Sequence, residues 1–309
     1  MNRPPLTRFA WLSIAAALAT MALKALACLL TGSVGLLSDA IESLVNLAGG
    51  VMALAMLSVA ARPADEEHAF GHHKAEYFSS GFEGSLIVLA AAAIGWTAVN
   101  RLLAPRPLTD LGLGLAISVG ASLVNLAAAV LLLRAGRRHD SITLEADARH
   151  LLADVWTSVG VVAGVGAVAL TDWQRLDPII ALAVAANIVR TGVGIVRRSV
   201  GGLMDQALAP ADQARIDDVL AAFRREGIQF HAVMTRQAGA RKFVSLHVLV
   251  PGDWTVSRGH ELLERLEAEI RRALAHTIVF THLEPQGDPA SWADEKLERS
   301  EPAARSRPP

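Results

Sequence analysis

Two short stretches of the sequence carry polar side chains at matching positions inside long apolar segments. Each stretch holds three side chains with oxygen or nitrogen donors, spaced three and then four residues apart. They are Asp39, Glu42 and Asn46 in the first stretch and Asp147, His150 and Asp154 in the second. On a helix this spacing puts each set on one face. Ionisable groups in lipid are costly and mark functional sites by default, so the two faces suggest one metal site between two helices.

The composition divides the 309-residue chain into an apolar part and a charged part. Residues 8 to about 200 are mostly Ala, Leu, Val and Gly, whereas residues 205–309 are mixed and charged. The formal net charge of −1 gives no indication of a nucleic-acid partner. Cys28 is the single cysteine, which excludes a disulfide framework and a thiolate cluster. Metal sites in this chain must therefore use His, Asp and Glu.

Six segments meet the requirement of about 20 mostly apolar residues for a membrane-spanning helix. They cover residues 8–30, 35–60, 78–102, 109–133, 144–170 and 178–200. The first segment lacks the cleavage site of a signal peptide and is expected to be retained. The second and fifth segments carry the polar faces and are expected to face the bundle interior, while the third and sixth cover the bundle or form a dimer contact. Lys24 is expected to pair with a carboxylate or to extend towards the membrane surface.

The distribution of Lys and Arg in short loops predicts the orientation, because loops rich in these residues stay in the cytoplasm. One side carries Arg3, Arg8, Arg62, Lys74, Arg134, Arg137, Arg138, Arg197 and Arg198, and the other carries Arg101, Arg106 and Arg175. The first side, with both termini, is expected to be cytoplasmic. The chain carries no organelle signal, so the plasma (bacterial inner) membrane is the expected location.

The part after residue 201 predicts a small α+β domain. Alternation of apolar residues favours strands, and apolar residues every three or four positions favour helices. The expected elements are a helix over 210–225, strands over 228–236 and 242–250, a helix over 256–274 and a strand over 277–284. Residues 287–309 are rich in Pro, Ser, Glu and Arg, and a disordered tail is expected there.

Several motifs, in this order, resemble those of the cation diffusion facilitators. They are Gly32-Ser33-Val34 with Ser38-Asp39, Pro63-Ala64-Asp65 with His68-Ala69-Phe70-Gly71-His72-His73-Lys74-Ala75-Glu76, Ala146-Asp147 with His150 and Asp154, and Leu203-Met204-Asp205. The resemblance covers residues from about 8 to 286. It implies an all-α six-helix transmembrane domain over 1–204, followed by a ferredoxin-like α+β cytoplasmic domain over 205–286 that binds metal and forms a homodimer.

The resemblance also implies a tetrahedral transport site, with two ligands from the second span and two from the fifth. The matching positions are Glu42, Asn46, His150 and Asp154. The family usually has Asp or His, then Asp, in the second span, so Glu42 is longer and Asn46 is neutral. One imidazole, two carboxylates and an amide suit a divalent first-row ion, with Zn first and Fe, Mn or Co as alternatives.

The remaining polar residues receive supporting or regulatory roles from the same resemblance. Asp39 and Asp147 are alternative ligands, but on a helix each lies about 4.5 Å along the axis from the matched position, so they are expected to serve helix packing or proton access. Asp65, His68 and His72 would form a second metal site in the loop after the second span. Lys74 and Asp205 would form a charge pair that joins the two domains. The soluble domain would bind metal through residues drawn from His231, His247, His260, His282 and Glu284.

The expected function is secondary active efflux of a divalent metal in exchange for protons, by alternating access, rather than an enzymatic reaction. A first alternative is a membrane-bound metal sensor or scaffold that binds without transporting; sensing, however, needs only the soluble domain. A second alternative is an intramembrane metallohydrolase. It would need a motif such as His-Glu-x-x-His on one helix, and the sequence has none.

Overall fold

The computed structural model describes residues 6–31, 34–104 and 111–292. The side chains of residues 27–28, 30–42, 111–115, 165 and 169 lie outside that description. By contacts between residues, the chain divides into two compact units, Met1–Leu203 and Met204–Pro309. Each unit is described below by itself.

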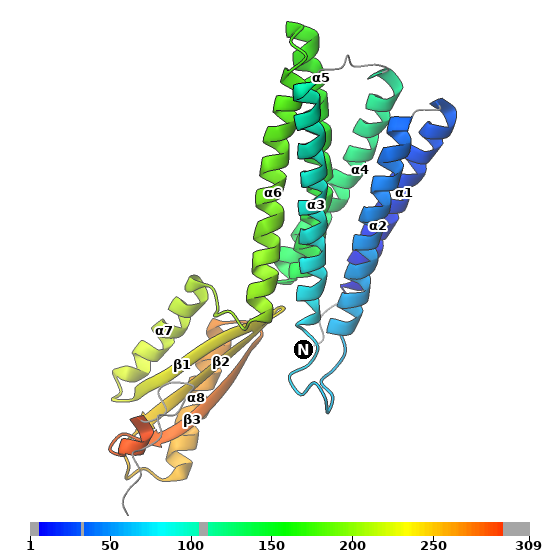
Figure 1. Cartoon of the computed structure of the whole chain (residues 1–309). Coiled ribbons are helices and arrows are strands. Elements are labelled where there is room, and N and C mark those ends of the chain that lie inside the picture. Colours follow the sequence, from blue (N-terminus) through cyan, green and yellow to red (C-terminus); the bar gives the residue numbers. More distant parts are fainter. Residues whose placement is uncertain (1–5, 32–33, 105–110, 293–309) are drawn as a thin grey trace, which may run out of the picture. The chain divides into compact units, whose positions relative to one another are not determined.

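The first unit is a bundle of long apolar helices (Figure 1). They are α1 Thr7–Thr31, α2 Val34–Ala60, α3 Ala75–Leu103, α4 Leu111–Arg138, α5 Ile142–Thr171 and α6 Leu176–Leu203. All 6 are long and apolar enough to cross a membrane, which confirms the predicted six-helix fold. The chain is therefore a multi-pass membrane protein. Most of its apolar outer surface suits lipid rather than water.

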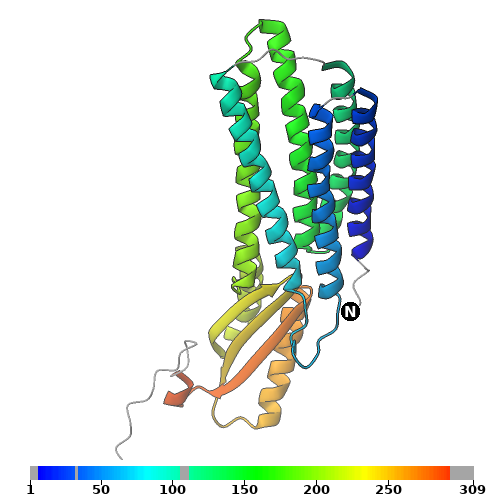
Figure 2. The same ribbon diagram turned by 45° about the vertical axis from the view of Figure 1, so that its right-hand side comes forward.

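Helices α3 and α6 pack closely against each other, and they lie side by side in both views (Figures 1 and 2). Gly84 and Gly192 allow this approach: a Cβ at Gly84 would lie 3.1 Å from the Gly192 oxygen, and one at Gly192 would lie 3.0 Å from the Gly84 oxygen. Ser80 and Ser199 share a buried hydrogen bond of 2.6 Å between their hydroxyls. Small residues and buried hydroxyls are typical of contacts between helices in membranes. This packing fixes the face that α3 turns towards α5.

The start of α5 is fixed by hydrogen bonds at its first turn. Ser141 is the N-cap, and its hydroxyl oxygen accepts from the Leu144 amide. The same hydroxyl donates to the Glu76 carboxylate on α3, and Glu76 is fully buried. These bonds set the rotation of α5, so that Asp147 and His150 are also buried in the bundle.

The second unit is a three-stranded sheet covered on one face by two helices. Its elements are α7 Pro210–Arg224, β1 Gln229–Ala238, β2 Arg241–Val250, α8 Val256–Ala273, β3 Thr277–Pro285 and the short 3-10 helix η1 Pro289–Trp292. The strand order is β1-β2-β3, with β1 antiparallel and β3 parallel to β2 (Figure 2). Helix α8 makes the crossover that a parallel pair requires. This mixed sheet with helices confirms the predicted α+β class.

Alternation along β2 separates the core of this unit from its polar face. Val244, Leu246, Val248 and Val250 pack with the apolar stripes of both helices in one core. Ser245 and His247 therefore point to the opposite face of the sheet. Within the tail predicted from residue 287, η1 is structured, and the residues after 292 lie outside the described part.

Candidate metal centres

Asn46 on α2 meets His150 and Asp154 on α5 inside the first unit. The three residues line one cavity of about 200 Å³. Nδ2 of Asn46 donates a hydrogen bond to Oδ2 of Asp154. The carbonyl oxygen of Asn46 is buried and has no hydrogen-bond partner among the described residues. It is therefore an oxygen donor available to a cation. The side chain of Glu42, the fourth predicted ligand, lies outside the described part of the chain, as does that of Asp39.

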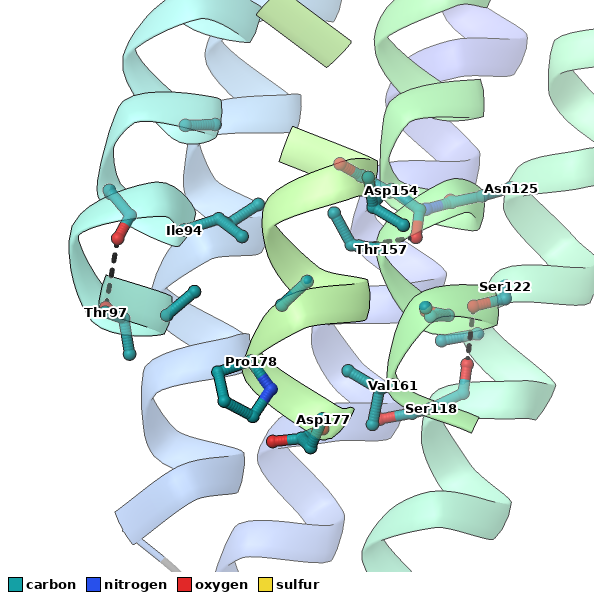
Figure 3. Close-up of a pocket in the computed structure, with 18 of the residues that line it drawn as sticks. Ile94, Thr97, Ser118, Ser122, Asn125, Asp154, Thr157, Val161, Asp177 and Pro178 are labelled. Carbon is teal, nitrogen blue, oxygen red and sulfur yellow. Dashed lines mark hydrogen bonds between the residues drawn. The ribbon is translucent and has the colours of Figure 1, made fainter. Parts of the chain in front are cut away.

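Asp154 also faces a larger cavity, of about 620 Å³, whose lining includes Asn46, Lys24, Arg101 and Asp177. Figure 3 shows Asp154 at one end of this cavity and Asp177 at the other. Arg101 and Asp177 stand near the end of α3 and the start of α6 and form an ion pair of 3.1 Å. The cavity thus leads from the polar centre to the end of the bundle away from the loop between α2 and α3.

Two polar residues that the sequence analysis missed also contact this centre. Asn125 on α4 donates from Nδ2 to Oδ2 of Asp154 at 3.3 Å. Glu83 on α3 is fully buried and contacts Nδ1 of His150. The third span, expected to cover the bundle or form a dimer contact, thus also brings a polar side chain into the bundle interior. Each residue is a polar side chain within an apolar span, and that signal could have revealed both.

Asp147 lies one turn before His150 and is also buried. Its Oδ1 accepts a hydrogen bond of 2.9 Å from the Ser13 hydroxyl on α1. This bond ties α5 to α1, which fits the supporting role in helix packing that the sequence suggested for Asp147.

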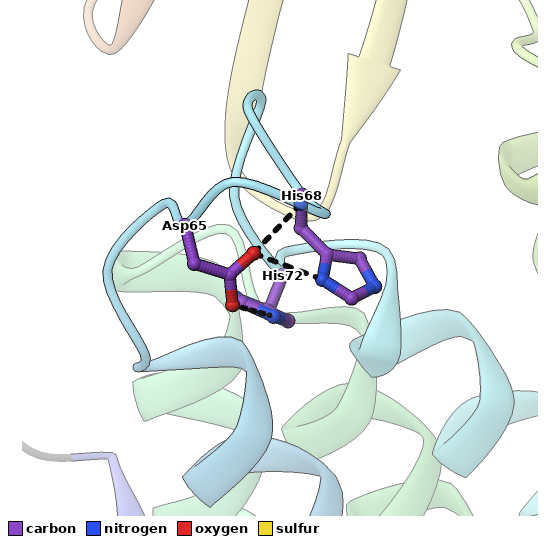
Figure 4. A group of neighbouring side chains, drawn as sticks. All are labelled: Asp65, His68 and His72. Carbon is purple, nitrogen blue, oxygen red and sulfur yellow. Dashed lines mark hydrogen bonds and ion pairs between the residues drawn. The ribbon is translucent and has the colours of Figure 1, made fainter.

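The loop between α2 and α3 brings Asp65, His68 and His72 together (Figure 4). Oδ1 of Asp65 lies 3.1 Å from Nδ1 of His68, and Oδ2 lies 3.3 Å from Nε2 of His72. Desolvation would raise the pKa of Asp65, but hydrogen bonds from the backbone and ring of His68 outweigh it and lower this pKa below its ordinary value. Asp65 is thus an anion at neutral pH, the form that binds a cation.

Three histidines stand side by side across the sheet of the second unit. His231 on β1 is the register partner of His247 on β2, and His247 is the partner of His282 on β3. Glu284 follows two residues later on β3, so its side chain shares their face, opposite the helices. Its carboxylate lies 2.7 Å from Nε2 of His231, 3.4 Å from Nδ1 of His247 and 3.5 Å from Nε2 of His282.

The atoms of His231, His247 and Glu284 are close enough to share one metal ion, since they all lie within 4.8 Å of one another. Nδ1 of His231 is buried without a hydrogen-bond partner among the described residues. Trp292 of η1 stacks on the His231 ring at 5.4 Å and shields it. Two imidazoles and a carboxylate suit Zn²⁺ or a similar first-row ion.

Three residues to which the sequence analysis gave a role, His260, Lys74 and Asp205, belong to none of the candidate metal centres within one chain. His260 is an exposed residue of α8, 4.0 Å from Glu264 on the same helix, and is not a member of the histidine group. Lys74 donates to the Leu203 carbonyl oxygen at 3.2 Å, and Asp205 accepts from Arg236 at 3.2 Å. The pair between Lys74 and Asp205 would join the two units and stays a prediction.

Comparisons with known proteins match nearly the whole chain. Residues 10–204 match the cation efflux transmembrane domain, and residues 208–286 match the cytoplasmic domain of cation efflux proteins. The chain is 52% identical to the uncharacterised transporter sll1263 of Synechocystis sp. over 301 residues, which cover 97% of each chain. It is 28% identical to the cation-efflux pump FieF of Salmonella arizonae over 280 residues, 90% of this chain and 92% of the pump.

Proposed function

Because this chain belongs to the cation diffusion facilitator family of cation efflux transporters, we propose that it exports a divalent metal ion in exchange for protons. The observation that carries the proposal is the meeting of Asn46, His150 and Asp154, from two helices, in one cavity within the membrane-spanning bundle. Glu42, one turn before Asn46 on α2, is proposed as the fourth ligand. Zn²⁺ is the first candidate, with Fe²⁺, Mn²⁺ and Co²⁺ as alternatives.

Competition between metal and protons for the same ligands couples metal export to proton entry. An ionised carboxylate without a counter-charge is unfavourable in a medium of low dielectric constant. Either protons or a dication must therefore occupy the centre, and each expels the other because ligands bind metal in their deprotonated form. An ion that enters from the cytoplasm leaves on the other side when protons replace it, provided that the bundle alternates between two states.

The larger cavity supports a release route. It extends from Asn46 and Asp154 towards Arg101 and Asp177. The excess of Lys and Arg at the opposite end of the bundle favours a cytoplasmic loop at residues 61–74 and an outer face at Arg101. In that orientation, both termini are cytoplasmic, and the larger cavity extends from the centre towards the outer face of the plasma membrane.

Proton coupling predicts that a pH gradient drives metal movement. In proteoliposomes that contain a metal-sensitive dye, Zn²⁺ uptake should rise several-fold when the lumen is more acidic than the bath, because outgoing protons replace ions that enter. An ionophore that collapses the gradient should remove this increase. Zn²⁺ uptake at the same rate with and without the gradient would contradict antiport, and saturable binding without any flux would favour a sensor or scaffold.

The two centres outside the bundle are proposed to hold regulatory metal. His231, His247 and Glu284, with His282 beside them, would bind an ion in the cytoplasmic domain of a homodimer. His260 lies outside this group within one chain, so it would bind a metal ion only at a different site of the dimer. Asp65, His68 and His72 would bind an ion near the entrance. Metal that prefers one arrangement of the domains shifts the population towards it and thereby alters transport.

A change of Glu284 to Gln tests the cytoplasmic centre. Its carboxylate contacts three histidines, so Glu284→Gln should remove about one bound Zn²⁺ per chain from the full-length protein, because a neutral amide is a weaker ligand. Elemental analysis after gel filtration measures the loss. Glu264→Gln is the matched control, because Glu264 is an exposed carboxylate of α8 in the same unit. Equal Zn²⁺ content in both variants would exclude this centre.

A further inference from the structure

Glu83 is an acidic residue in the first third of the membrane-spanning helix α3, Ala75–Leu103, and it is fully buried. Its Oε2 contacts Nδ1 of His150, and its Oε1 has no hydrogen-bond partner among the described residues. An acidic side chain at such a depth is expensive unless it has a function. Its direct partner is a residue proposed above as a ligand of the transported ion.

The backbone of α2 makes room for this carboxylate. A Cβ built at Gly49 would overlap Glu83, so any other residue at this position would displace the carboxylate or shift the helix. Gly49 follows Asn46 by one turn on the same helix. The Glu83 carboxylate therefore sits where α2, α3 and α5 meet, between the backbone of one ligand-bearing helix and the imidazole of the other.

The contact with Glu83 decides which nitrogen of His150 can bind a metal. When the Glu83 carboxylate accepts the hydrogen bond of this contact, Nδ1 carries the proton and Nε2 keeps its lone pair. His150 lines the cavity together with Asn46 and Asp154, and Nε2 is the ring nitrogen left for an ion there. A carboxylate behind a metal-binding histidine fixes the ring and makes it a stronger ligand.

Glu83 also brings an acidic side chain to a centre where Asn46 is a neutral amide. On these grounds, and resting on the proposed transport function, we propose that Glu83 is a positioning residue of the transport site. It holds His150 in the metal-binding tautomer and stabilises the bound dication from the side of α3. The transport site is then built by three helices, and α3 takes part in ion binding.

Conservative and truncating substitutions at position 83 separate this role from a structural one. Glu83→Gln keeps the shape and an acceptor for Nδ1 but removes the charge, whereas Glu83→Ala removes both. Zn²⁺ flux into proteoliposomes should show KM raised at least about 10-fold in Glu83→Ala, with an intermediate rise in Glu83→Gln. Flux at saturating Zn²⁺ should change less than KM, because the loss concerns binding.

Direct binding of Co²⁺ provides a second measurement. The full-length protein with His68→Ala and His247→Ala lacks a ligand in the loop and cytoplasmic centres, so its visible Co²⁺ spectrum reports the intramembrane centre. Adding Glu83→Gln should weaken Co²⁺ affinity and alter the spectrum. Glu76→Gln is the matched control: Glu76 is a fully buried carboxylate of the same helix that bonds Ser141 instead of a ligand, and glutamine keeps an oxygen that accepts this bond and so preserves the start of α5.

The proposal is overturned if Glu83→Gln has the wild-type KM and Co²⁺ spectrum, or if Glu76→Gln changes both as strongly. Failure of the transport function itself has a different signature, because the wild-type protein would then neither move Zn²⁺ nor bind Co²⁺ at the intramembrane centre. Should Glu83→Ala fail to fold, Glu83→Gln alone decides, since it preserves the volume and the hydrogen bond.

Discussion

Divalent-metal flux is expected to fall at least about 100-fold in Asp154→Ala. Oδ2 of Asp154 accepts hydrogen bonds from Nδ2 of Asn46 and, at 3.3 Å, from Nδ2 of Asn125. The substitution removes a proposed ligand and leaves two amide groups without their acceptor. Loss of one partner from a buried charged contact costs about 3 kcal/mol or more, which corresponds to about 100-fold in affinity.

Initial rates of Zn²⁺ uptake into proteoliposomes with equal protein content measure this loss. Asp172→Asn is a matched control on the same helix. Asp172 ends α5 in the left-handed conformation with φ 58°, which asparagine also adopts readily, and it lies far along the helix from the centre. Wild-type flux in Asp154→Ala would remove the α2–α5 centre from the transport mechanism.

Asn46→Asp is expected to change ion preference more than any other single substitution at the centre. The new carboxylate would lie against Asp154, and the two anions would attract a dication more strongly than the present amide does. One added charge about 4 Å from the ion is worth about 4 kcal/mol per unit of ionic charge at an effective dielectric constant of 20, before desolvation. Affinity should therefore rise at least about 100-fold, and maximal flux should fall because release is slower.

Competition assays with Zn²⁺, Mn²⁺, Fe²⁺ and Co²⁺ measure the relative KM values of wild type and variant. Asn187→Asp is a suitable control, because Asn187 is an exposed amide of α6 that bonds Arg190 at 3.4 Å. If the order of ion preference and the KM values do not move in Asn46→Asp, then Asn46 is not a ligand.

Hydropathy and residue spacing predicted the architecture well, because both signals are local. Continuous apolar segments of adequate length gave the six spans, and the alternation from Phe243 to Val250 gave the central strand. The Asp65 and His68 cluster also lies close in sequence. For such features, the backbone geometry of one element determines which side chains meet.

Contacts between distant helices could not be predicted in this way. Glu83 and His150 are 67 residues apart, and Asn125 and Asp154 are 29 apart. Their meeting depends on the rotation of each helix, which the glycine contact between α3 and α6 and the Ser141 cap of α5 determine. The repeated polar faces mark the second and fifth spans, whereas a single glutamate in the third forms no such pattern. The approach of His231 to Glu284 likewise depends on strand register.

The overlap between Gly49 and Glu83 has a consequence for the evolution of such transporters. A residue with a Cβ at position 49 would push the Glu83 carboxylate out of its present place, whereas a sequence without that carboxylate has room for a side chain there. The residues at positions 49 and 83 should therefore vary together among homologues. Residues larger than glycine at position 49 should occur only where position 83 has a small or a non-acidic residue. Ion selectivity in those lineages would have to be built on a different set of charges.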